Sequence, residues 1–253
     1  MIASALLTAA TANVKFITLG DWGGKALGGY HATDVDAVAS AMGTCATSNP
    51  INFLINTGDN FYYCGIQNTS DFQIATDFTG PYSASVLNVN WYGVLGNHEY
   101  GYNVQAQLEL AKMDLKPKWG MDDRYYTKRI QLGGSSYVSF IFIDTNPCIS
   151  DYRANDPANW DPCSTEFPTC SPIEEGPCKF HENILAQDCQ AQFTWFKKAL
   201  AAVPKDDWLI VVGHHPAGAT RARPLRAPSL CPCLVFHRVT VTLPHATASL
   251  FGR

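Results

Sequence analysis

Short apolar runs, each followed by a glycine, are spaced along most of the chain. They cover residues 14–19, 51–56, 91–95 and 208–212, and the glycines that end them are Gly20, Gly58, Gly96 and Gly213. A short apolar run that stops at a glycine is typical of a buried β-strand. The pattern therefore predicts four buried strands.

Segments with helical periodicity lie between these runs. Residues 31–47 and 104–113 carry apolar residues at the spacing of one helix face, and so do residues 188–200. Asp188 is a favourable N-cap residue for the last of these helices. Three helices are therefore predicted, and they alternate with the strands.

A β-hairpin is predicted near the middle of the chain. Residues 125–132 and 135–143 have the pattern of strands and flank the pair Gly133-Gly134, which is a turn signal. Strands that alternate with helices favour an α/β fold, to which the hairpin adds an antiparallel pair. We assign all of these elements to one domain, residues 13–216.

A Cys-rich insert at 146–189 interrupts the pattern. It contains five cysteines, many prolines and little periodicity; the cysteines are Cys148, Cys163, Cys170, Cys178 and Cys189. A loop of this length is rare unless it is functional or braced. Two disulfides among the five cysteines are expected, and their pairing cannot be deduced from the sequence.

Composition and charge exclude several classes of protein. The 253 residues carry a net charge of −4, so the whole chain is not a polycation that neutralises nucleic-acid phosphates. No run approaches the roughly 20 apolar residues that cross a bilayer. Nine cysteines indicate an oxidising compartment.

Both ends of the chain differ from the body. Residues 1–12 resemble the second half of a secretory signal, and the alternative is an N-terminal arm. Residues 217–253 contain five arginines and no acidic residue. Our hypothesis is that this basic tail arose by a frameshift or mis-splicing, and the alternative is a genuine solvated tail.

A glycosylation sequon begins at Asn68 and matters if the chain is secreted.

Polar residues with metal-binding chemistry follow the predicted strands. Each lies shortly after one of the glycines, and the set is Asp21, Asp59, Tyr62, Asn97, His98, His214 and His215. Ligand sites of α/β sheets lie beyond the carboxyl ends of the strands, so these side chains are expected to converge at one edge. A mixed set of oxygen and nitrogen ligands suits iron, manganese or zinc.

The strand-end motifs resemble blocks of the metallophosphoesterases, or calcineurin-like phosphoesterases. They are GDWGG at 20–24, GDNFY at 58–62, GNHE at 96–99 and GHHP at 213–216. Two details indicate the purple, or tartrate-resistant, acid phosphatases: Trp22-Gly23 replaces the x-His that often follows the first Asp, and Tyr62 stands three residues after the second Asp. The resemblance implies an α/β/β/α sandwich with two mixed sheets, truncated here at the C-terminal side.

The resemblance also implies a dinuclear metal centre. Asp59 bridges the two metals, and Asp21 and Tyr62 bind the first, which is expected to be Fe(III). Asn97 and His214 bind the second, which is Fe(II), Zn or Mn. A pair of cations needs a bridging anion, and it holds both the attacking and the leaving oxygens of an in-line displacement.

The implied reaction is the hydrolysis of phosphate monoesters at acid pH by a metal-bound hydroxide, with Asp59 and His98 as catalytic residues. His98 and Asn97 are expected to contact the substrate, a small phosphomonoester or a phosphoprotein. His215 has no matching role and is expected to be structural. The implied location is secreted, lysosomal or vacuolar, with no nucleic-acid or membrane partner.

The family's fifth block, Gly-His-x-His, is missing from the tail. His237 and His245 are the only histidines after residue 216, and they are not spaced as in that block. Each metal therefore lacks one ligand, and we expect weak metal retention and a large loss of rate. Residues 239–243 have the pattern of a strand.

Three alternatives stay open at this point. One is a related phosphoesterase, such as a diesterase or a nucleotidase, against which Gly23 and Tyr62 argue. Another is a catalytically impaired, metal-poor relative that acts only by binding. The third is a cysteine-rich secreted binding protein whose working surface is the Cys-rich insert, and it leaves the strand-end motifs unexplained.

Overall fold

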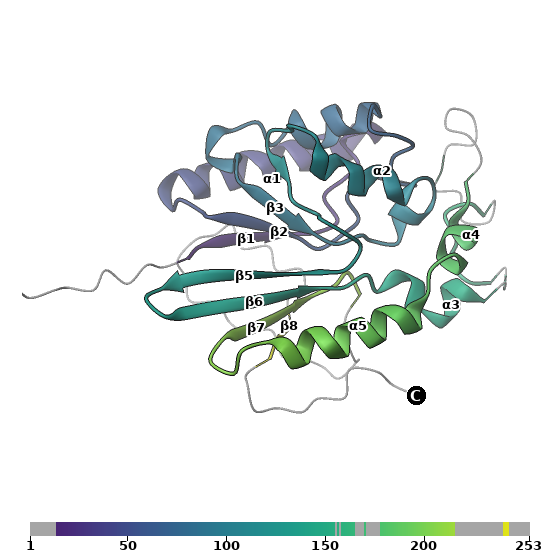
Figure 1. Cartoon of the computed structure of the whole chain (residues 1–253). Helices are drawn as coiled ribbons and strands as arrows, with labels where there is room; N and C mark the ends of the chain where they lie inside the picture. Colours follow the sequence, from purple (N-terminus) through teal and green to yellow (C-terminus); the bar gives the residue numbers. More distant parts are fainter. Residues whose placement is uncertain are drawn as a thin grey trace, which may run out of the picture.

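Two four-stranded sheets pack face to face, and helices cover their outer faces (Figure 1). The computed structural model describes residues 14–154, 156, 158–164, 170, 178–215 and 240–242. The predicted α/β/β/α sandwich is confirmed. The predictions for residues 1–12 and for most of the basic tail lie outside the described residues.

The first sheet is parallel in its four described strands, so of the two mixed sheets that the resemblance implied only the second is mixed. Its strands lie in the order β1 (Phe16–Leu19), β2 (Phe53–Asn56), β3 (Asn90–Gly93) and β4 (Lys118–Trp119). Every residue of β2 is buried, as is usual for a parallel strand that is covered on both faces. Because the strands are parallel, the carboxyl ends of β1, β2 and β3 reach the same edge, where the sequence predicts the site.

The second sheet is mixed. Its order is β5 (Tyr126–Gly133), β6 (Ser136–Phe142), β7 (Trp208–Val212) and β8 (Thr240–Thr242). β5 and β6 form the predicted antiparallel hairpin, β6 and β7 are parallel, and β8 pairs antiparallel to β7. β8 lies within the strand predicted at 239–243, so this short part of the basic tail belongs to the sheet.

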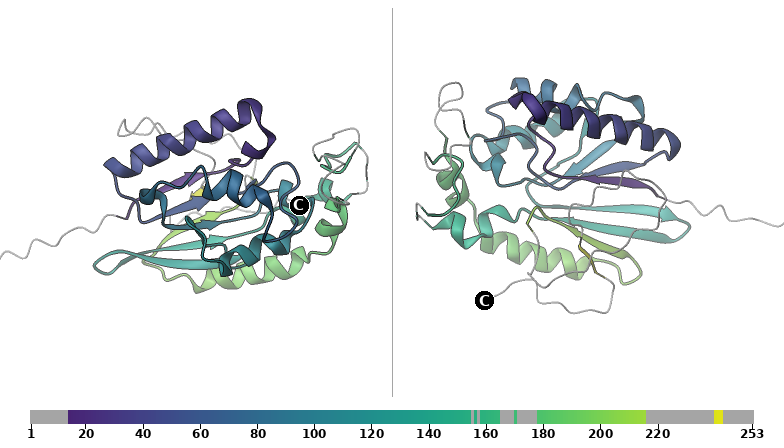
Figure 2. Two further views of the ribbon diagram at one scale, coloured as in Figure 1. Left: turned by 90° about the horizontal axis from the view of Figure 1, so that it is seen from above. Right: turned by 180° about the vertical axis from the view of Figure 1, so that it is seen from behind.

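Helices form the two outer layers and also cover one end of the sandwich (Figure 1). They are α1 (Gly29–Ser48), α2 (Val104–Glu109), α3 (Ser150–Arg153), α4 (Phe180–Leu185) and α5 (Cys189–Ala202). Figure 2 shows α1 across the outer face of the first sheet and α5 against the second. The Asp188 side chain accepts hydrogen bonds from the backbone N–H groups of Gln190 and Ala191, which confirms it as the N-cap of α5. None of the helices in the described segments is long and apolar enough to span a membrane.

Short helical turns connect these elements. They are the 3-10 turns Lys25–Leu27, Ser85–Leu87, His98–Tyr100, Leu110–Lys112 and Asn146–Cys148 and the π-helix Ile74–Thr79. The turn at His98–Tyr100 begins directly after Asn97 and belongs to the loop that follows β3. Two predicted site residues are therefore placed by β3 and this turn together.

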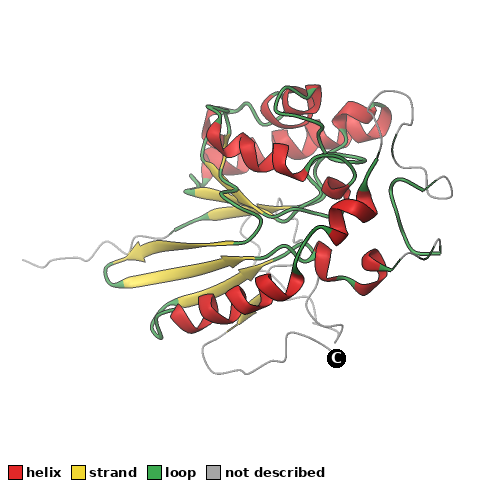
Figure 3. Ribbon diagram, turned by 45° about the vertical axis from the view of Figure 1, so that its right-hand side comes forward, coloured by secondary structure: helices red, strands yellow, loops and turns green. Residues whose placement is uncertain are grey.

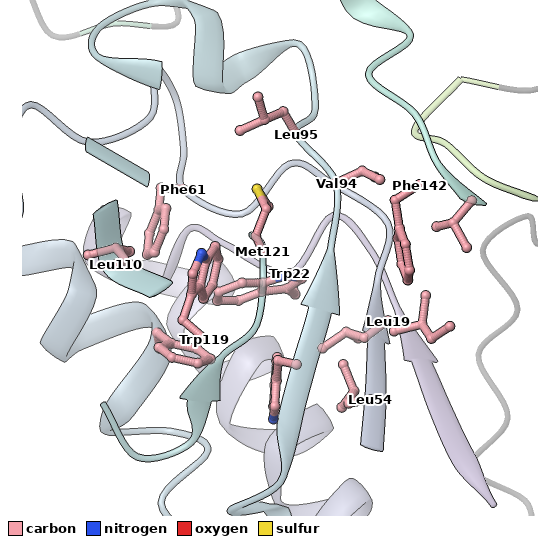
Figure 4. Packing of buried hydrophobic residues seen from close by; sticks show 14 of the residues in the cluster. Leu19, Trp22, Leu54, Phe61, Val94, Leu95, Leu110, Trp119, Met121 and Phe142 are labelled. Carbon is pink, nitrogen blue, oxygen red and sulfur yellow. The ribbon is translucent and has the colours of Figure 1, made fainter. Parts of the chain in front are cut away.

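Trp22 lies at the centre of a group of packed aromatic side chains on one face of the first sheet (Figure 4). Its ring centroid lies between 5.6 and 6.3 Å from those of five other aromatic side chains, which are Phe61, Phe78, Tyr82, Trp91 and Trp119. Its indole N–H donates a hydrogen bond to Asn56 Oδ1 at 2.9 Å. The residue after Asp21 thus anchors the first loop to the core.

Three disulfides brace the Cys-rich insert, which includes α3 and α4 at one end of the sandwich (Figure 3). Cys148–Cys189 and Cys163–Cys178 confirm the expectation of two disulfides among the five cysteines of the insert. The third, Cys64–Cys170, joins the insert to the loop after β2. This disulfide holds the insert against the predicted site.

A matched pair of tryptophan substitutions tests the role of Trp22. Trp22 is 3% exposed, so Trp22→Leu removes buried ring contacts and should lower the free energy of unfolding by about 3 kcal/mol. Trp208 is 51% exposed, and Trp208→Leu should change it by less than about 0.5 kcal/mol. Chemical denaturation measures both, and equal losses in the two variants would contradict this account of the core.

Candidate metal centre

Three loops of the first sheet and one loop of the second bring the predicted ligands together. Asp21 follows β1, Asp59 follows β2, Asn97 follows β3 and His214 follows β7. One ligand atom each of Asp21, Asp59 and His214 lies within 4.8 Å of the other two. The convergence expected from the strand ends is therefore present in the structure.

Both carboxylate oxygens of Asp59 face other predicted ligands. The Tyr62 hydroxyl donates to Asp59 Oδ2 at 3.2 Å and lies 3.4 Å from Asp21 Oδ1. On the other side, Asp59 Oδ1 lies 3.5 Å from His214 Nε2. Asp59 is therefore placed between a pair of ligands from the first sheet, Asp21 and Tyr62, and the histidine that follows β7.

Burial shifts the pKa values of Asp59 and Tyr62. It raises the pKa of Asp59 to about 6, although the nearby His214 imidazole lowers it. Burial and the Asp59 carboxylate raise the pKa of the Tyr62 phenol above its usual range, so the phenol keeps its proton. A bound cation would reverse both effects, because it stabilises carboxylate and phenolate anions.

The orientation of His214 leaves a lone pair pointing at other acceptors. His214 Nδ1 donates to the carbonyl oxygen of Thr57 at 2.9 Å, so in the neutral ring Nε2 carries the lone pair. This Nε2 lies 3.0 Å from Asn97 Oδ1 and also faces Asp59. A lone pair among oxygen acceptors needs a proton or a cation between them, so the donor set fits a metal ion.

His98 stands at the side of the Asp59 carboxylate. Its Nδ1 donates to the carbonyl oxygen of Tyr63 at 2.6 Å, and its Nε2 lies 4.0 Å from Asp59 Oδ2. The imidazole is in ring contact with Tyr62, at 4.5 Å, and with Trp160, at 4.9 Å. Burial lowers the pKa of His98, which favours the neutral ring in the absence of a bound anion.

Glu99 is a positioning residue whose role the local sequence pattern does not predict. Its buried carboxylate accepts four backbone hydrogen bonds, from the N–H groups of Asp59, Asn60, Phe61 and Gly96, at 2.6 to 3.1 Å. It thereby ties the loop after β2 to the loop after β3. Burial raises the pKa of Glu99 to about 7. The only signal in the sequence was its place directly after Asn97 and His98.

Close backbone approach explains two of the strand-end glycines. A Cβ atom on Gly96 would collide with the backbone nitrogen and the carboxylate of Asp59, and one on Gly58 would lie 2.8 Å from the Gly96 nitrogen. Asp21 and Asp59 themselves adopt positive φ angles of 53° and 52°. Non-glycine residues rarely adopt this conformation, and it is concentrated at functional sites.

His215 and Asn68, which the sequence also singled out, lie apart from the predicted metal ligands. His215 contacts Thr145 Oγ1 at 2.9 Å and the Tyr152 hydroxyl at 3.3 Å, which are contacts of a structural histidine. Asn68 is exposed, and its Oδ1 accepts a hydrogen bond from the backbone N–H of Ser70. His237 and His245 lie outside the described residues.

The Glu99 bridge predicts a stability effect. Glu99→Gln keeps the size of the side chain, but its amide turns a donor toward backbone N–H groups and leaves some of them unsatisfied. The free energy of unfolding should fall by about 2–4 kcal/mol, as measured by chemical denaturation. Glu109→Gln on the exposed side of α2 is the control and should have no effect. A Glu99→Gln protein as stable as the parent would show that the bridge is dispensable.

The chain matches a family model over nearly its whole length. The model describes the calcineurin-like phosphoesterases, and it matches residues 14–243, a range that includes part of the basic tail. The match agrees with the four strand-end motifs and with the observed fold.

The similar curated proteins are acid phosphatases. Tartrate-resistant acid phosphatase type 5 of Sus scrofa is 29% identical over 244 residues, which is 93% of this chain and 64% of that protein. Purple acid phosphatase 7 of Arabidopsis thaliana is 36% identical over 140 residues, which is 55% of this chain and 39% of that protein. The chain thus spans less than two thirds of the length of either relative.

A solved structure shares the fold. It is titled "GAP50 the anchor in the inner membrane complex of Plasmodium", and it matches with a TM-score of 0.57 and 20% identity over 81% of this chain and 55% of that one. At this identity the similarity shows the fold alone. The resemblance to purple acid phosphatases is confirmed by the curated relatives, and the chain belongs to the calcineurin-like phosphoesterase family.

Proposed function

We propose that this protein hydrolyses phosphate monoesters at acid pH with a pair of metal ions bound on either side of Asp59. The single observation that carries the proposal is the position of Asp59. Its Oδ2 faces Tyr62 and its Oδ1 faces His214, so one carboxylate touches both sets of ligands. A bridging carboxylate is what two neighbouring cations require.

Each side of Asp59 offers a distinct set of ligands. Asp21 and Tyr62 form a hard anionic set that suits Fe(III), and Asn97 with His214 forms a set that suits Fe(II), Zn or Mn. A metal pair bound there would polarise the phosphoryl group and lower the pKa of a coordinated water molecule. The names of the curated relatives, which are acid phosphatases, support this assignment.

His98 connects the reaction to acid pH. Its Nδ1 is fixed as a donor to the Tyr63 carbonyl, so Nε2 can donate only when the ring is protonated. Protonation at acid pH would let Nε2 hold a phosphoryl oxygen or give a proton to the leaving oxygen. A phosphate anion bound beside the imidazole would favour this protonation.

The remaining site groups orient the substrate. Asn97 uses its Oδ1 toward His214, which leaves its side-chain N–H₂ group able to donate to a phosphoryl oxygen. Glu99 holds the loops that carry Asp59 and His98. We infer a small phosphomonoester or a phosphoprotein as substrate, and the three disulfides support a secreted, lysosomal or vacuolar location.

A metal-poor relative that only binds is the second candidate. The observation that favours it is that residues 217–253 carry no Gly-His-x-His block. Within the described part of the chain, the histidines that approach Asp59 are His98 and His214. Such a protein would bind phosphate without turning it over.

Hydrolysis of an aryl phosphate separates these candidates. With iron and zinc supplied in excess, the chain should hydrolyse 4-nitrophenyl phosphate at pH 5 at a rate that the missing ligands lower, and a chelator should lower this rate further by at least about 100-fold. The diester bis(4-nitrophenyl) phosphate should react at least about tenfold more slowly if the protein is a monoesterase. Phosphate binding without metal-dependent hydrolysis would support the metal-poor relative instead, and faster cleavage of the diester would support a diesterase.

Tyr62 predicts the colour of the iron-loaded protein. A phenolate bound to Fe(III) absorbs visible light by charge transfer, so Tyr62→Phe should bleach the protein while the ring keeps its packing. Tyr63→Phe is the matched control, because its hydroxyl contacts His31 and not Asp59. The measurement is the visible spectrum at equal iron content. A purple Tyr62→Phe protein would show that another residue is the ligand.

A further inference from the structure

A cavity in the Cys-rich insert lies outside the group of metal ligands. It has a volume of about 410 Å³ and is lined by residues of α3, by described residues between Ala154 and Ser164, and by the first two residues of α4. Binding sites for small molecules have volumes of roughly 300–1,000 Å³. The cavity is therefore large enough for part of a small ligand.

Trp160 belongs both to the lining of this cavity and to the surroundings of His98. Trp160 lines the cavity, and its ring centroid lies 4.9 Å from that of His98 at an interplanar angle of 65°. His98 Nε2 in turn lies 4.0 Å from Asp59 Oδ2. A phosphate held between Asp59 and His98 would thus have its leaving group near Trp160.

Aromatic packing and disulfides hold the indole in place. Trp160 packs edge-to-face on Phe180 at 5.3 Å, and Tyr152 lies 5.8 Å from Trp160 and 5.3 Å from Phe180. The disulfide Cys163–Cys178 closes the same segment. The wall of the cavity is therefore formed before any ligand binds, which lowers the cost of binding.

The cavity carries negative charge next to this aromatic wall. Asp151, Asp156 and Asp161 line it, and within the described residues no salt bridge neutralises them. His181 is the basic residue of the lining, and its Nδ1 lies 3.3 Å from the carbonyl oxygen of Tyr152. An aromatic face beside carboxylates attracts alkylammonium cations.

We infer that this cavity binds the leaving group of the phosphoester and selects one that carries an alkylammonium cation, such as a phosphorylated amino alcohol. The inference rests on the proposed function for the position of the phosphate. Binding of the cation itself needs only the aromatic wall and the carboxylates. A neutral leaving group of the same shape would lack the electrostatic attraction, and an acidic one would be repelled.

Binding of choline to the metal-free chain tests the inference. Choline and its neutral isostere 3,3-dimethylbutan-1-ol are titrated into the full chain at pH 7.5 with a chelator present, and binding is followed by NMR. Choline should bind at least about fivefold more tightly than the isostere. Equal affinity for the two probes, or no binding of choline, would overturn the inference.

Two variants locate the site. Trp160→Leu should weaken choline binding by about tenfold, and Trp208→Leu, which removes a distant exposed indole, should leave it unchanged. The double variant Asp156→Asn with Asp161→Asn removes two charges and keeps the oxygens that accept from the backbone N–H groups of Ala158 and Cys163. It should weaken binding by at least about threefold.

The two variants make the choline test independent of whether either one folds. If Trp160→Leu fails to fold, the aspartate double variant decides alone, and unchanged choline binding in it overturns the inference. Because no metal is present, a failure of phosphatase activity leaves this test intact. An active phosphatase that hydrolyses phosphocholine and 3,3-dimethylbutyl phosphate equally well, and does not bind choline, would contradict this inference and leave the proposed function standing.

Discussion

The site depends on how the charge of one buried carboxylate, that of Asp59, is compensated. His214 Nε2 lies 3.5 Å from one of its oxygens, and the Tyr62 hydroxyl lies 3.2 Å from the other. A buried anion is costly unless positive charge or hydrogen bonds offset it. In the metal-free chain burial raises the pKa of Asp59 to about 6, and the hydrogen bond from the Tyr62 hydroxyl offsets part of the charge of the ionised carboxylate. In the proposed metal-bound form, the same atoms would be ligands.

The rest of the fold holds these atoms close together. The parallel first sheet brings three loops to one edge, and β7 of the second sheet adds the loop of His214. Glu99 joins two of these loops through four backbone hydrogen bonds. Trp22 fixes the first loop in the aromatic core, and Cys64–Cys170 fixes the insert beside the site. The geometry is thus supported by packing and covalent links together.

The sequence predicts the parts of this architecture that follow from local patterns. Short apolar runs that end at glycine gave the strands, and the polar residues after them gave Asp21, Asp59 and His214 as neighbours. Glu99 was missed because its role depends on backbone N–H groups from two loops. The pairing of Cys64 with Cys170 and the contact of Trp160 with His98 join residues far apart in the chain, and no local pattern encodes them.

The central claim is that Asp59 bridges two metal ions, and metal stoichiometry tests it most directly. The full chain and its Asp59→Asn variant are equilibrated with saturating zinc by dialysis, and bound metal per chain is measured by mass spectrometry. The account predicts two ions in the parent chain and at most one in Asp59→Asn, because the variant lacks the anion between the two sites. Equal metal content in the two proteins would contradict it.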